Sequence, residues 1–171
     1  MKYLIQRENK KKEIILTKIR TKNLTNDQIN KICKIKMQKW KFNFKSQKNY
    51  FLNNYNSNDI HHLVYINNKI IGYNCLKFIK YFNKSIIIFD SLIVDKNHRK
   101  IGISKIILKS SIKQIFSKRI ECYLYSDKIL CKYYEKYGWV RINKKKLIPL
   151  NKKKLILMKL KSKSINKKIN S

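Results

Sequence analysis

A short turn between an apolar run and an amphipathic run carries the residues best suited to binding phosphate. It reads Arg99-Lys100-Ile101-Gly102-Ile103-Ser104 and precedes a segment with helical spacing of apolar residues. A helix N-terminus presents unpaired backbone N–H groups and the positive end of the helix dipole, and both attract phosphate. Arg99 and Lys100 add positive charge, and Gly102 lacks the Cβ that would hold a pyrophosphate away. The turn predicts a phosphate site, although a complete Walker A loop is absent.

Two carboxylates near this turn are candidates for a general base. Asp90 interrupts an apolar strand-like run, where burial would perturb a carboxylate. Regular alternation along that strand predicts that Asp90, Leu92 and Val94 share one face. Asp90 is therefore either a base or a structural carboxylate bonded to a neighbouring backbone or tyrosine. Glu121, on the adjacent predicted strand, is the second candidate.

The elements that must position these residues follow from hydrophobic periodicity. Asn26 and Ser46 are predicted N-caps of the first two helices. The turn Asn67-Asn68 predicts a hairpin. Strands are expected at 13–19, 63–66, 70–81, 85–94 and 120–125, helices at 26–40, 46–55, 102–117 and 129–137, and a last strand or pair within 147–160.

This order of elements predicts an α/β fold with helices on both faces of one sheet. The strand–helix–strand unit over 85–125 predicts a parallel pair with a right-handed crossover. The chain has only three glycines, so each position carries information. Gly102 opens the phosphate turn, and Gly138 follows the last predicted helix. Gly72 predicts a close backbone approach or a bulge.

Composition limits the domain organisation and the partners. With 171 residues, the chain is expected to form one domain over 1–160, followed by a basic, frayed tail at 161–171. The net charge of +33 has two explanations: binding of nucleic acid or another polyanion, or a drift towards A/T-rich codons. We favour drift, because arginine, the residue that reads nucleic acid best, is rare here.

The four cysteines form no CxxC pair, and no signal peptide or membrane-length apolar run is present. This composition favours reduced thiols, a cytoplasmic location and no membrane contact. His61 and His62 lack the company of further metal ligands, so they are expected to be structural or exposed. We therefore expect no metal.

Two linked motifs resemble those of the GCN5-related N-acetyltransferase (GNAT) superfamily. Residues 94–104 are similar to its acetyl-CoA motif, roughly V-x-P-x-x-R/Q-x-x-G-x-G/A. Residues 130–139 are similar to its A-x-x-F-Y-x-x-x-G-F. The departures are Lys96 for proline, Ser104 for the second small residue, Asp127 where Asn is frequent, and Leu130 for alanine. The resemblance implies a mixed, largely antiparallel sheet with a central parallel strand pair and helices on both faces.

The same resemblance implies acetyl-CoA as the acyl donor and assigns roles to individual residues. The backbone amides from Arg99 to Ser104, including those of Ile101 and Ile103, would hold the pyrophosphate. The strand edge formed by Leu92, Ile93 and Val94 would pair with pantetheine, and Asp127 would lie near the pantetheine arm. Tyr134 would protonate the departing thiolate, because a phenol with a pKa of about 10 can give a proton to a thiolate whose conjugate acid has a pKa of about 8.5. Otherwise Tyr134 is a packed helix aromatic.

The expected reaction is acetyl transfer to a primary amine of a small molecule or protein, by direct attack in a ternary complex. The aromatic residues between 40 and 55 either line the acceptor cleft or pack in the core: Trp40, Phe42, Phe44, Tyr50, Phe51 and Tyr55. The alternatives are a basic RNA- or polyanion-binding module and a GNAT fold that binds CoA without catalysis. Nucleic-acid contact is not favoured, and the sequence leaves monomer and homodimer open.

Overall fold

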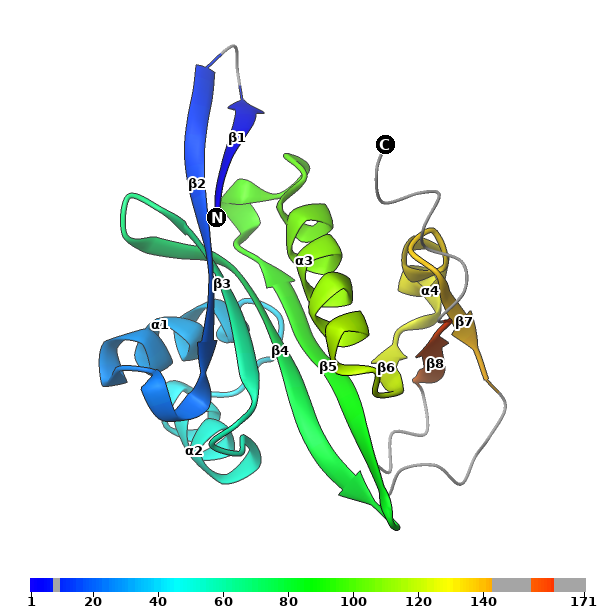
Figure 1. Cartoon of the computed structure of the whole chain (residues 1–171). Helices are drawn as coiled ribbons and strands as arrows, with labels where there is room; N and C mark the ends of the chain where they lie inside the picture. Colours follow the sequence, from blue (N-terminus) through cyan, green and yellow to red (C-terminus); the bar gives the residue numbers. More distant parts are fainter. Residues whose placement is uncertain (8–9, 143–154, 162–171) are drawn as a thin grey trace.

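The fold is a mixed sheet, seen in a computed structural model that describes residues 1–7, 10–142 and 155–161. Within these residues eight strands form one sheet in the order β1-β2-β3-β4-β5-β6-β8-β7 (Figure 1). Only β5 and β6 run parallel among the neighbouring pairs described. The predicted sheet, largely antiparallel with a central parallel pair, is confirmed. The strands are β1 Lys2–Arg7, β2 Lys10–Arg20, β3 Ile60–Ile66, β4 Lys69–Tyr81, β5 Lys84–Val94, β6 Cys122–Ser126, β7 Trp139–Arg141 and β8 Ile156–Leu160.

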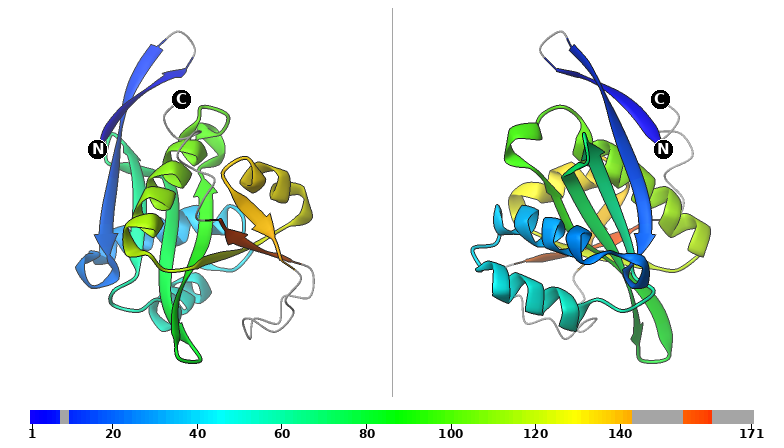
Figure 2. Two further views of the ribbon diagram at one scale, coloured as in Figure 1. Left: turned by 45° about the vertical axis from the view of Figure 1, so that its right-hand side comes forward. Right: turned by 90° about the vertical axis from the view of Figure 1, so that its left-hand side faces the viewer.

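Helices cover both faces of this sheet, as predicted (Figure 2). On one face, α1 (Asn26–Met37) and α2 (Phe44–Asn54) pack over β3, β4 and β5. On the other face, α3 (Ile103–Lys118) and α4 (Lys128–Glu135) bury their apolar sides. The crossover from β5 through α3 to β6 places the predicted phosphate turn at the start of α3.

Neither of the first two helices is capped by the residue predicted from the sequence; in each, an earlier residue is the cap. Thr25, not Asn26, caps α1: its hydroxyl accepts a hydrogen bond from the Gln28 amide, and the Gln28 side chain accepts one from the Thr25 amide. Asn43, not Ser46, caps α2, and its side chain accepts from the Ser46 amide over 2.8 Å. In both cases the cap is the residue whose side chain reaches the N–H three positions later.

Strand prediction missed the short elements. β1 and β7 were not expected, and β8 lies inside the range predicted for a last strand or pair. The rest of that range, 147–154, and most of the predicted tail, 162–171, lie outside the described residues. No helix in the described part of the chain is long and apolar enough to cross a membrane.

Gly72 marks a close approach, as predicted. A Cβ at this position would lie 2.8 Å from Ile107 Cδ1 and 2.9 Å from Ile103 Cγ2. Both isoleucines belong to α3, so the missing side chain lets α3 pack directly on β4.

A bulge in β5 overturns the predicted alternation around Asp90. Tyr73 pairs with Ile93 and Cys75 with Asp90, so Ser91 and Leu92 together oppose Asn74. Ser91 has a φ of 59°, and an extra residue of this kind shifts the side chains that follow it. Asp90 consequently faces α2, where Tyr55 binds it, while Leu92 and Val94 pack on the α3 side. The prediction that Asp90, Leu92 and Val94 share a face was wrong.

Candidate active site

The site begins where β5 and β6 separate. Their register consists of two pairs, Ile87 with Cys122 and Ile88 with Tyr123. Beyond these pairs, residues of both strands line a cavity of about 400 Å³, which we call the sheet cavity. Parallel strands that part in this way leave unpaired backbone groups facing the gap.

A second cavity of about 470 Å³ lies at the start of α3, and we call it the turn cavity. Gly102 is the N-cap of α3 with a φ of 85°, and Lys100 has a φ of 66°. A Cβ on Gly102 would meet no described protein atom within 4 Å, so it would point into open space beside the helix N-terminus. This turn therefore has a free helix end and a cradle that a side chain would fill, the arrangement that a phosphate ligand needs.

Most of the residues predicted to bind the cofactor meet at these cavities. Those that line the turn cavity are Leu92, Val94, Arg99, Lys100, Gly102, Ile103 and Ser104. Asp127 lines the sheet cavity. The side chains of Ile93 and Ile101 belong to hydrophobic clusters instead, so only their backbone groups are available to a ligand.

Asp95 holds the turn in place, a role that sequence reasoning missed. Its carboxylate accepts hydrogen bonds from Gln38 Nε2 over 2.8 Å, His98 Nδ1 over 2.9 Å and the Asn97 amide over 3.0 Å. Burial raises the pKa of Asp95, but these hydrogen bonds from Gln38, His98 and Asn97 outweigh it and lower the pKa overall. The end of α1 is thereby tied to the turn before α3.

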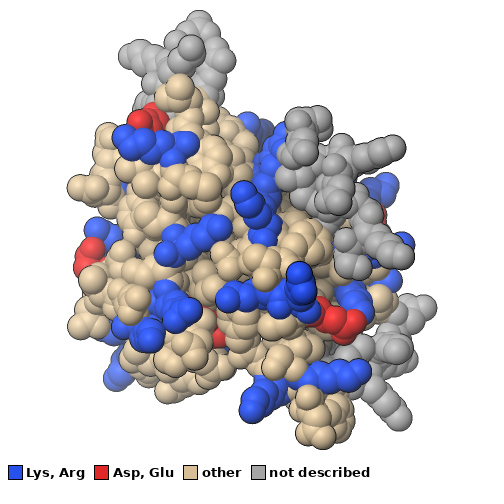
Figure 3. Space-filling model, in the orientation of Figure 1, with Lys and Arg blue, Asp and Glu red and all other residues tan. Residues whose placement is uncertain are grey.

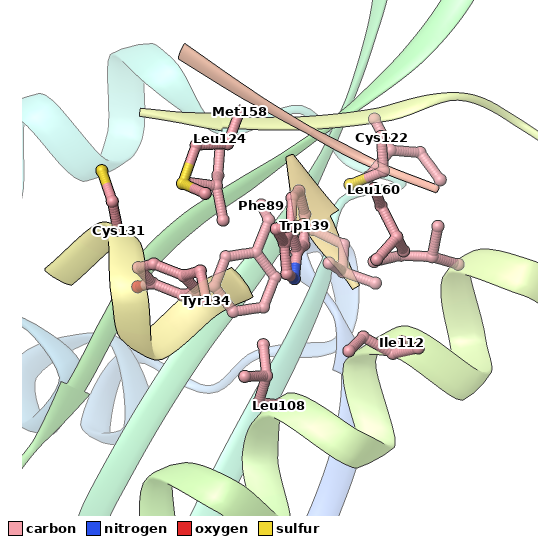
Figure 4. Packing of buried hydrophobic residues seen from close by; sticks show 13 residues of the cluster. Phe89, Leu108, Ile112, Cys122, Leu124, Cys131, Tyr134, Trp139, Met158 and Leu160 are labelled. Carbon is pink, nitrogen blue, oxygen red and sulfur yellow. The ribbon is translucent and has the colours of Figure 1, made fainter. Parts of the chain in front are cut away.

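Tyr134 lies where the two cavities meet. Leu92, Leu130 and Tyr134 line both cavities. The Tyr134 ring packs edge-on against Phe89 at a centroid distance of 6.1 Å, and its hydroxyl points away from the cluster (Figure 4). Burial raises the pKa of Tyr134, and its hydroxyl has no hydrogen-bond partner among the described residues. It is a neutral phenol with a proton to donate.

Asp90 lines the sheet cavity and is half-buried. Its Oδ2 accepts hydrogen bonds from the Tyr55 hydroxyl over 2.9 Å and from Ser91 Oγ over 3.0 Å. Within the described residues, no partner binds Oδ1. The predicted bond to a tyrosine is present, and it leaves one carboxylate oxygen for a ligand.

Glu121, the second predicted base, is not brought to this site. It precedes β6, whereas the cavity is lined by the other end of that strand, Leu124 to Ser126. Hydrogen bonds from Lys159 and Tyr123 occupy its carboxylate and lower its pKa. Its contacts are those of a surface ion pair.

The aromatic residues predicted to line a cleft divide into two groups. Trp40 and Tyr50 line the sheet cavity. Phe51 and Tyr55 are buried in the cluster under α1 and α2, against which Phe44 also packs. Phe42 is exposed. The sequence could not separate these groups, because aromatic residues serve both as core and as cavity walls.

Charged groups in the sheet cavity have both signs. Lys39, Lys77 and Lys80 line it together with Asp90 and Asp127. Lys39 pairs with Asp127 at 3.7 Å. Elsewhere, lysine and arginine side chains are spread over the face shown in Figure 3, with uncharged surface between them.

His61 and His62 are buried, so the structural prediction for them holds. His61 bonds to Tyr73 over 3.0 Å and to Thr21 over 2.8 Å. Burial lowers the pKa of both histidines to about 3. Across the described residues, no group of three or more His, Cys, Asp or Glu side chains could hold a metal ion.

Comparison with known protein families identifies one whose sequence profile matches this chain. The sequence profile of the Acetyltransferase (GNAT) family matches residues 29–139, about two thirds of the chain. No curated protein sequence matches significantly.

Three similar solved structures share the fold at low sequence identity. Escherichia coli ElaA is 12% identical with a TM-score of 0.69, covering 86% of this chain and 99% of its own. The PaiA N-acetyltransferase of Thermoplasma acidophilum, in complex with coenzyme A, is 16% identical with a TM-score of 0.59, covering 86% of this chain and 99% of its own. Arabidopsis thaliana Naa50, in complex with the bisubstrate analogue CoA-Ac-MVNAL, is 14% identical with a TM-score of 0.62, covering 86% of this chain and 98% of its own.

Proposed function

Since this chain belongs to the GNAT acetyltransferase family, we propose that it transfers an acetyl group from acetyl-CoA to a primary amine by direct attack in a ternary complex. The observation that carries the proposal is the meeting of two cavities at Tyr134. One cavity has the features of a phosphate site, and the other holds a carboxylate beside aromatic walls. A donor and an acceptor bound in these two cavities would meet at the tyrosine hydroxyl.

The turn cavity is the proposed place of the CoA pyrophosphate. The amides of residues 99–104 would bind its oxygens, with Arg99 and Lys100 adding charge. Pantetheine would then extend along the unpaired edge of Leu92 to Val94, towards Tyr134. The PaiA neighbour, solved in complex with coenzyme A, supports CoA as the ligand.

The sheet cavity is the proposed place of the acceptor amine. Asp90 would take a proton from the ammonium form through its free Oδ1, because only a neutral amine can attack a carbonyl. The amine nitrogen then bonds to the acetyl carbon, and the C–S bond breaks. Tyr134 would give its proton to the departing CoA thiolate and take the remaining proton of the attacking nitrogen, so that the amide and the free thiol form and the phenol is regenerated.

The acceptor is a small molecule or a protein amine. The Naa50 neighbour holds a bisubstrate analogue that joins CoA to a peptide. That complex supports an arrangement in which donor and acceptor are bound side by side, as the two joined cavities would allow.

The proposal is tested by mixing the protein with acetyl-CoA and a panel of amines and measuring released thiol. Acetyl-CoA alone should also raise the melting temperature, since a ligand at 100 times its Kd stabilises a fold by about 2.7 kcal/mol. Salt-sensitive RNA binding with no effect of acetyl-CoA would overturn the proposal in favour of a polyanion-binding module. Stabilisation without thiol release from any amine would instead indicate a CoA-binding fold that does not catalyse.

A further inference from the structure

Lys36, on α1, is buried next to the sheet cavity. Among the residues whose burial is described, it is the only buried lysine or arginine, with 3% of its surface exposed. The codon-drift explanation that we favour accounts for lysines on the surface, where substitutions cost little. It does not explain one in the core, because burying an ammonium group is costly unless specific partners stabilise it.

The partners of Lys36 are aromatic. Its Nζ lies 5.1 Å from the ring centroid of Tyr50, 5.2 Å from that of Tyr55 and 5.6 Å from that of Trp40. Rings at these distances favour the charged form of a lysine through cation–π attraction. No carboxylate lies within ion-pair distance of Nζ in the described part of the chain.

A chain of two hydrogen bonds connects Lys36 to the proposed base. Lys36 Nζ donates to the Tyr55 hydroxyl over 3.0 Å, and that hydroxyl donates to Asp90 Oδ2 over 2.9 Å. Because the ammonium fills an acceptor position on the Tyr55 oxygen, the hydroxyl proton is directed at Asp90. Tyr55 closes the C-terminal end of α2, and Lys36 lies near that of α1. Two helices therefore fix one oxygen of the carboxylate.

We propose that Lys36 and Tyr55 are positioning residues for acetyl transfer: Lys36 orients the Tyr55 hydroxyl, which holds Oδ2 of Asp90 and leaves Oδ1 to receive the amine proton. This proposal rests on the function proposed above. Neither residue touches the substrate; they act through Asp90. Burial lowers the pKa of Lys36, and attraction to the Asp90 carboxylate opposes that shift, so the two groups are also coupled by charge.

The electrostatic part of the proposal depends on which groups face Asp90. Lys36 comes from α1, Lys77 from β4 and Asp59 from the loop before β3, and across the cavity Lys39 is paired with Asp127. Burial raises the pKa of the surrounding tyrosines and cysteine and lowers that of the histidine, which makes these groups neutral at pH 7: Tyr50, Tyr55, Tyr73, Cys75 and His61. Among the groups packed against Asp90, Lys36 is therefore the cation joined to it by hydrogen bonds.

The test replaces Lys36 by methionine, which keeps the length of the side chain and removes the charge. We expect Lys36→Met to lower kcat about tenfold and to leave the KM for acetyl-CoA within about twofold, as loss of a group that acts on the base requires. Lys34→Met is the matched control: it removes the same charge from an exposed position two residues away on α1 and should change neither.

A double-mutant cycle tests whether Lys36 acts through Tyr55. Tyr55→Phe removes only the hydroxyl, and it serves as the second variant if Lys36→Met does not fold. The Lys36→Met/Tyr55→Phe double variant should have a kcat close to that of the slower single variant, since both changes break the same chain of bonds. Full additivity of the two effects would overturn the proposed linkage, and so would an unchanged kcat in Lys36→Met.

A readout without turnover separates this proposal from the proposed function. In protein labelled with ¹³C-aspartate, NMR resolves the five aspartate carboxyls, and Asp90→Asn identifies the Asp90 signal. The chemical shift of that signal at pH 7 should change in Lys36→Met and in Tyr55→Phe and stay unchanged in Lys34→Met. A change in a protein that transfers no acetyl group would refute the function alone. No change in Lys36→Met would refute the role of Lys36, whether or not the wild-type chain is active.

Discussion

The side-chain amide of Asn74 donates a hydrogen bond to the backbone carbonyl of Asp90 over 2.7 Å. The bond spans the bulge, where Asn74 alone opposes Ser91 and Leu92. Ser111 Oγ donates to Asn74 Oδ1 over 2.9 Å, so α3 holds Asn74 in turn. Asn74 thus supplies a hydrogen bond between β4 and β5 at the point where the bulge interrupts their backbone pairing. It fixes the local twist of β5, which presents Asp90 to the sheet cavity.

Asn74→Ala should destabilise the protein by about 2 kcal/mol, because it leaves the part-buried Asp90 carbonyl without this donor and the buried Ser111 hydroxyl with only its 3.4 Å contact to His62. It should also lower kcat, since the bulge would no longer hold Asp90. Denaturant unfolding and thiol release measure the two effects. Asn30→Ala is the control: Asn30 Oδ1 is buried with no partner among the described residues, so its loss should cost little. Wild-type stability and kcat in Asn74→Ala would refute the role of this bond.

Tyr134→Phe should lower kcat about 100-fold, the usual contribution of a general acid. The KM for acetyl-CoA and the melting temperature should change little, because the ring keeps its place against Phe89. Tyr137→Phe, near the end of the same helix and lining neither cavity, should keep full activity. If Tyr134→Phe turns over at the wild-type rate, the acid assigned here is wrong.

Gly102→Ala and Gly72→Ala should separate ligand binding from packing. Alanine at 102 must adopt a φ of 85°, which costs about 1–2 kcal/mol, and its methyl group would occupy the proposed pyrophosphate site. Alanine at 72 collides with Ile103 and Ile107 of α3, and such overpacking costs about 1–3 kcal/mol.

Unfolding experiments should therefore show both glycine variants destabilised. Calorimetry should show weakened acetyl-CoA binding only in Gly102→Ala. Equal loss of affinity in both would mean that the turn cavity is not the cofactor site.

Because of His62, the free energy of unfolding should fall as the pH is lowered. Burial lowers its pKa in the folded protein to about 3, from 6.5. Between those values the unfolded chain takes up a proton that the folded chain does not. The free energy of unfolding therefore falls as the pH drops from about 6.5 towards 3, by about 1.4 kcal/mol per pH unit for each such histidine.

Replacing His62 by leucine should remove its share of that dependence and leave the share of His61. His62 Nε2 is buried with no partner among the described residues, and Nδ1 makes only a long contact with Ser111 Oγ at 3.4 Å, so His62→Leu should cost little at pH 7. Urea unfolding at pH 7, 6 and 5 compares the slopes of the variant and the wild type. Parallel slopes would show that His62 is protonated in the folded state as readily as in the unfolded one.

Some residues of the candidate site could be predicted from the sequence, and others could not. The phosphate turn was predicted from local spacing, because a strand, a glycine and a helix in succession place their own backbone groups, and Tyr134 was predicted from the family resemblance. Asp90 was found from its charge in an apolar strand, but its face was assigned wrongly. A bulge depends on which groups of the neighbouring strand can form hydrogen bonds with it. Here the partner is Asn74, which lies 16 positions earlier in the sequence. Glu121 was proposed from strand adjacency, and only the register of β5 with β6 shows which end of β6 reaches the cavity.

The sequence alone predicted the order of the longer elements and a phosphate turn, since these depend on periodicity and on residues adjacent in the chain, and the mixed sheet followed from the family resemblance. Only the tertiary structure decided the surroundings of the carboxylate: the bulge held by Asn74, the hydroxyl of Tyr55 and the buried ammonium of Lys36. In the sequence, Lys36 is one of 42 basic residues, with nothing to mark it. Its burial is a property of the packing of α1 and α2 against the sheet, where non-local contacts, rather than residue type, set the cost and the role of a charge.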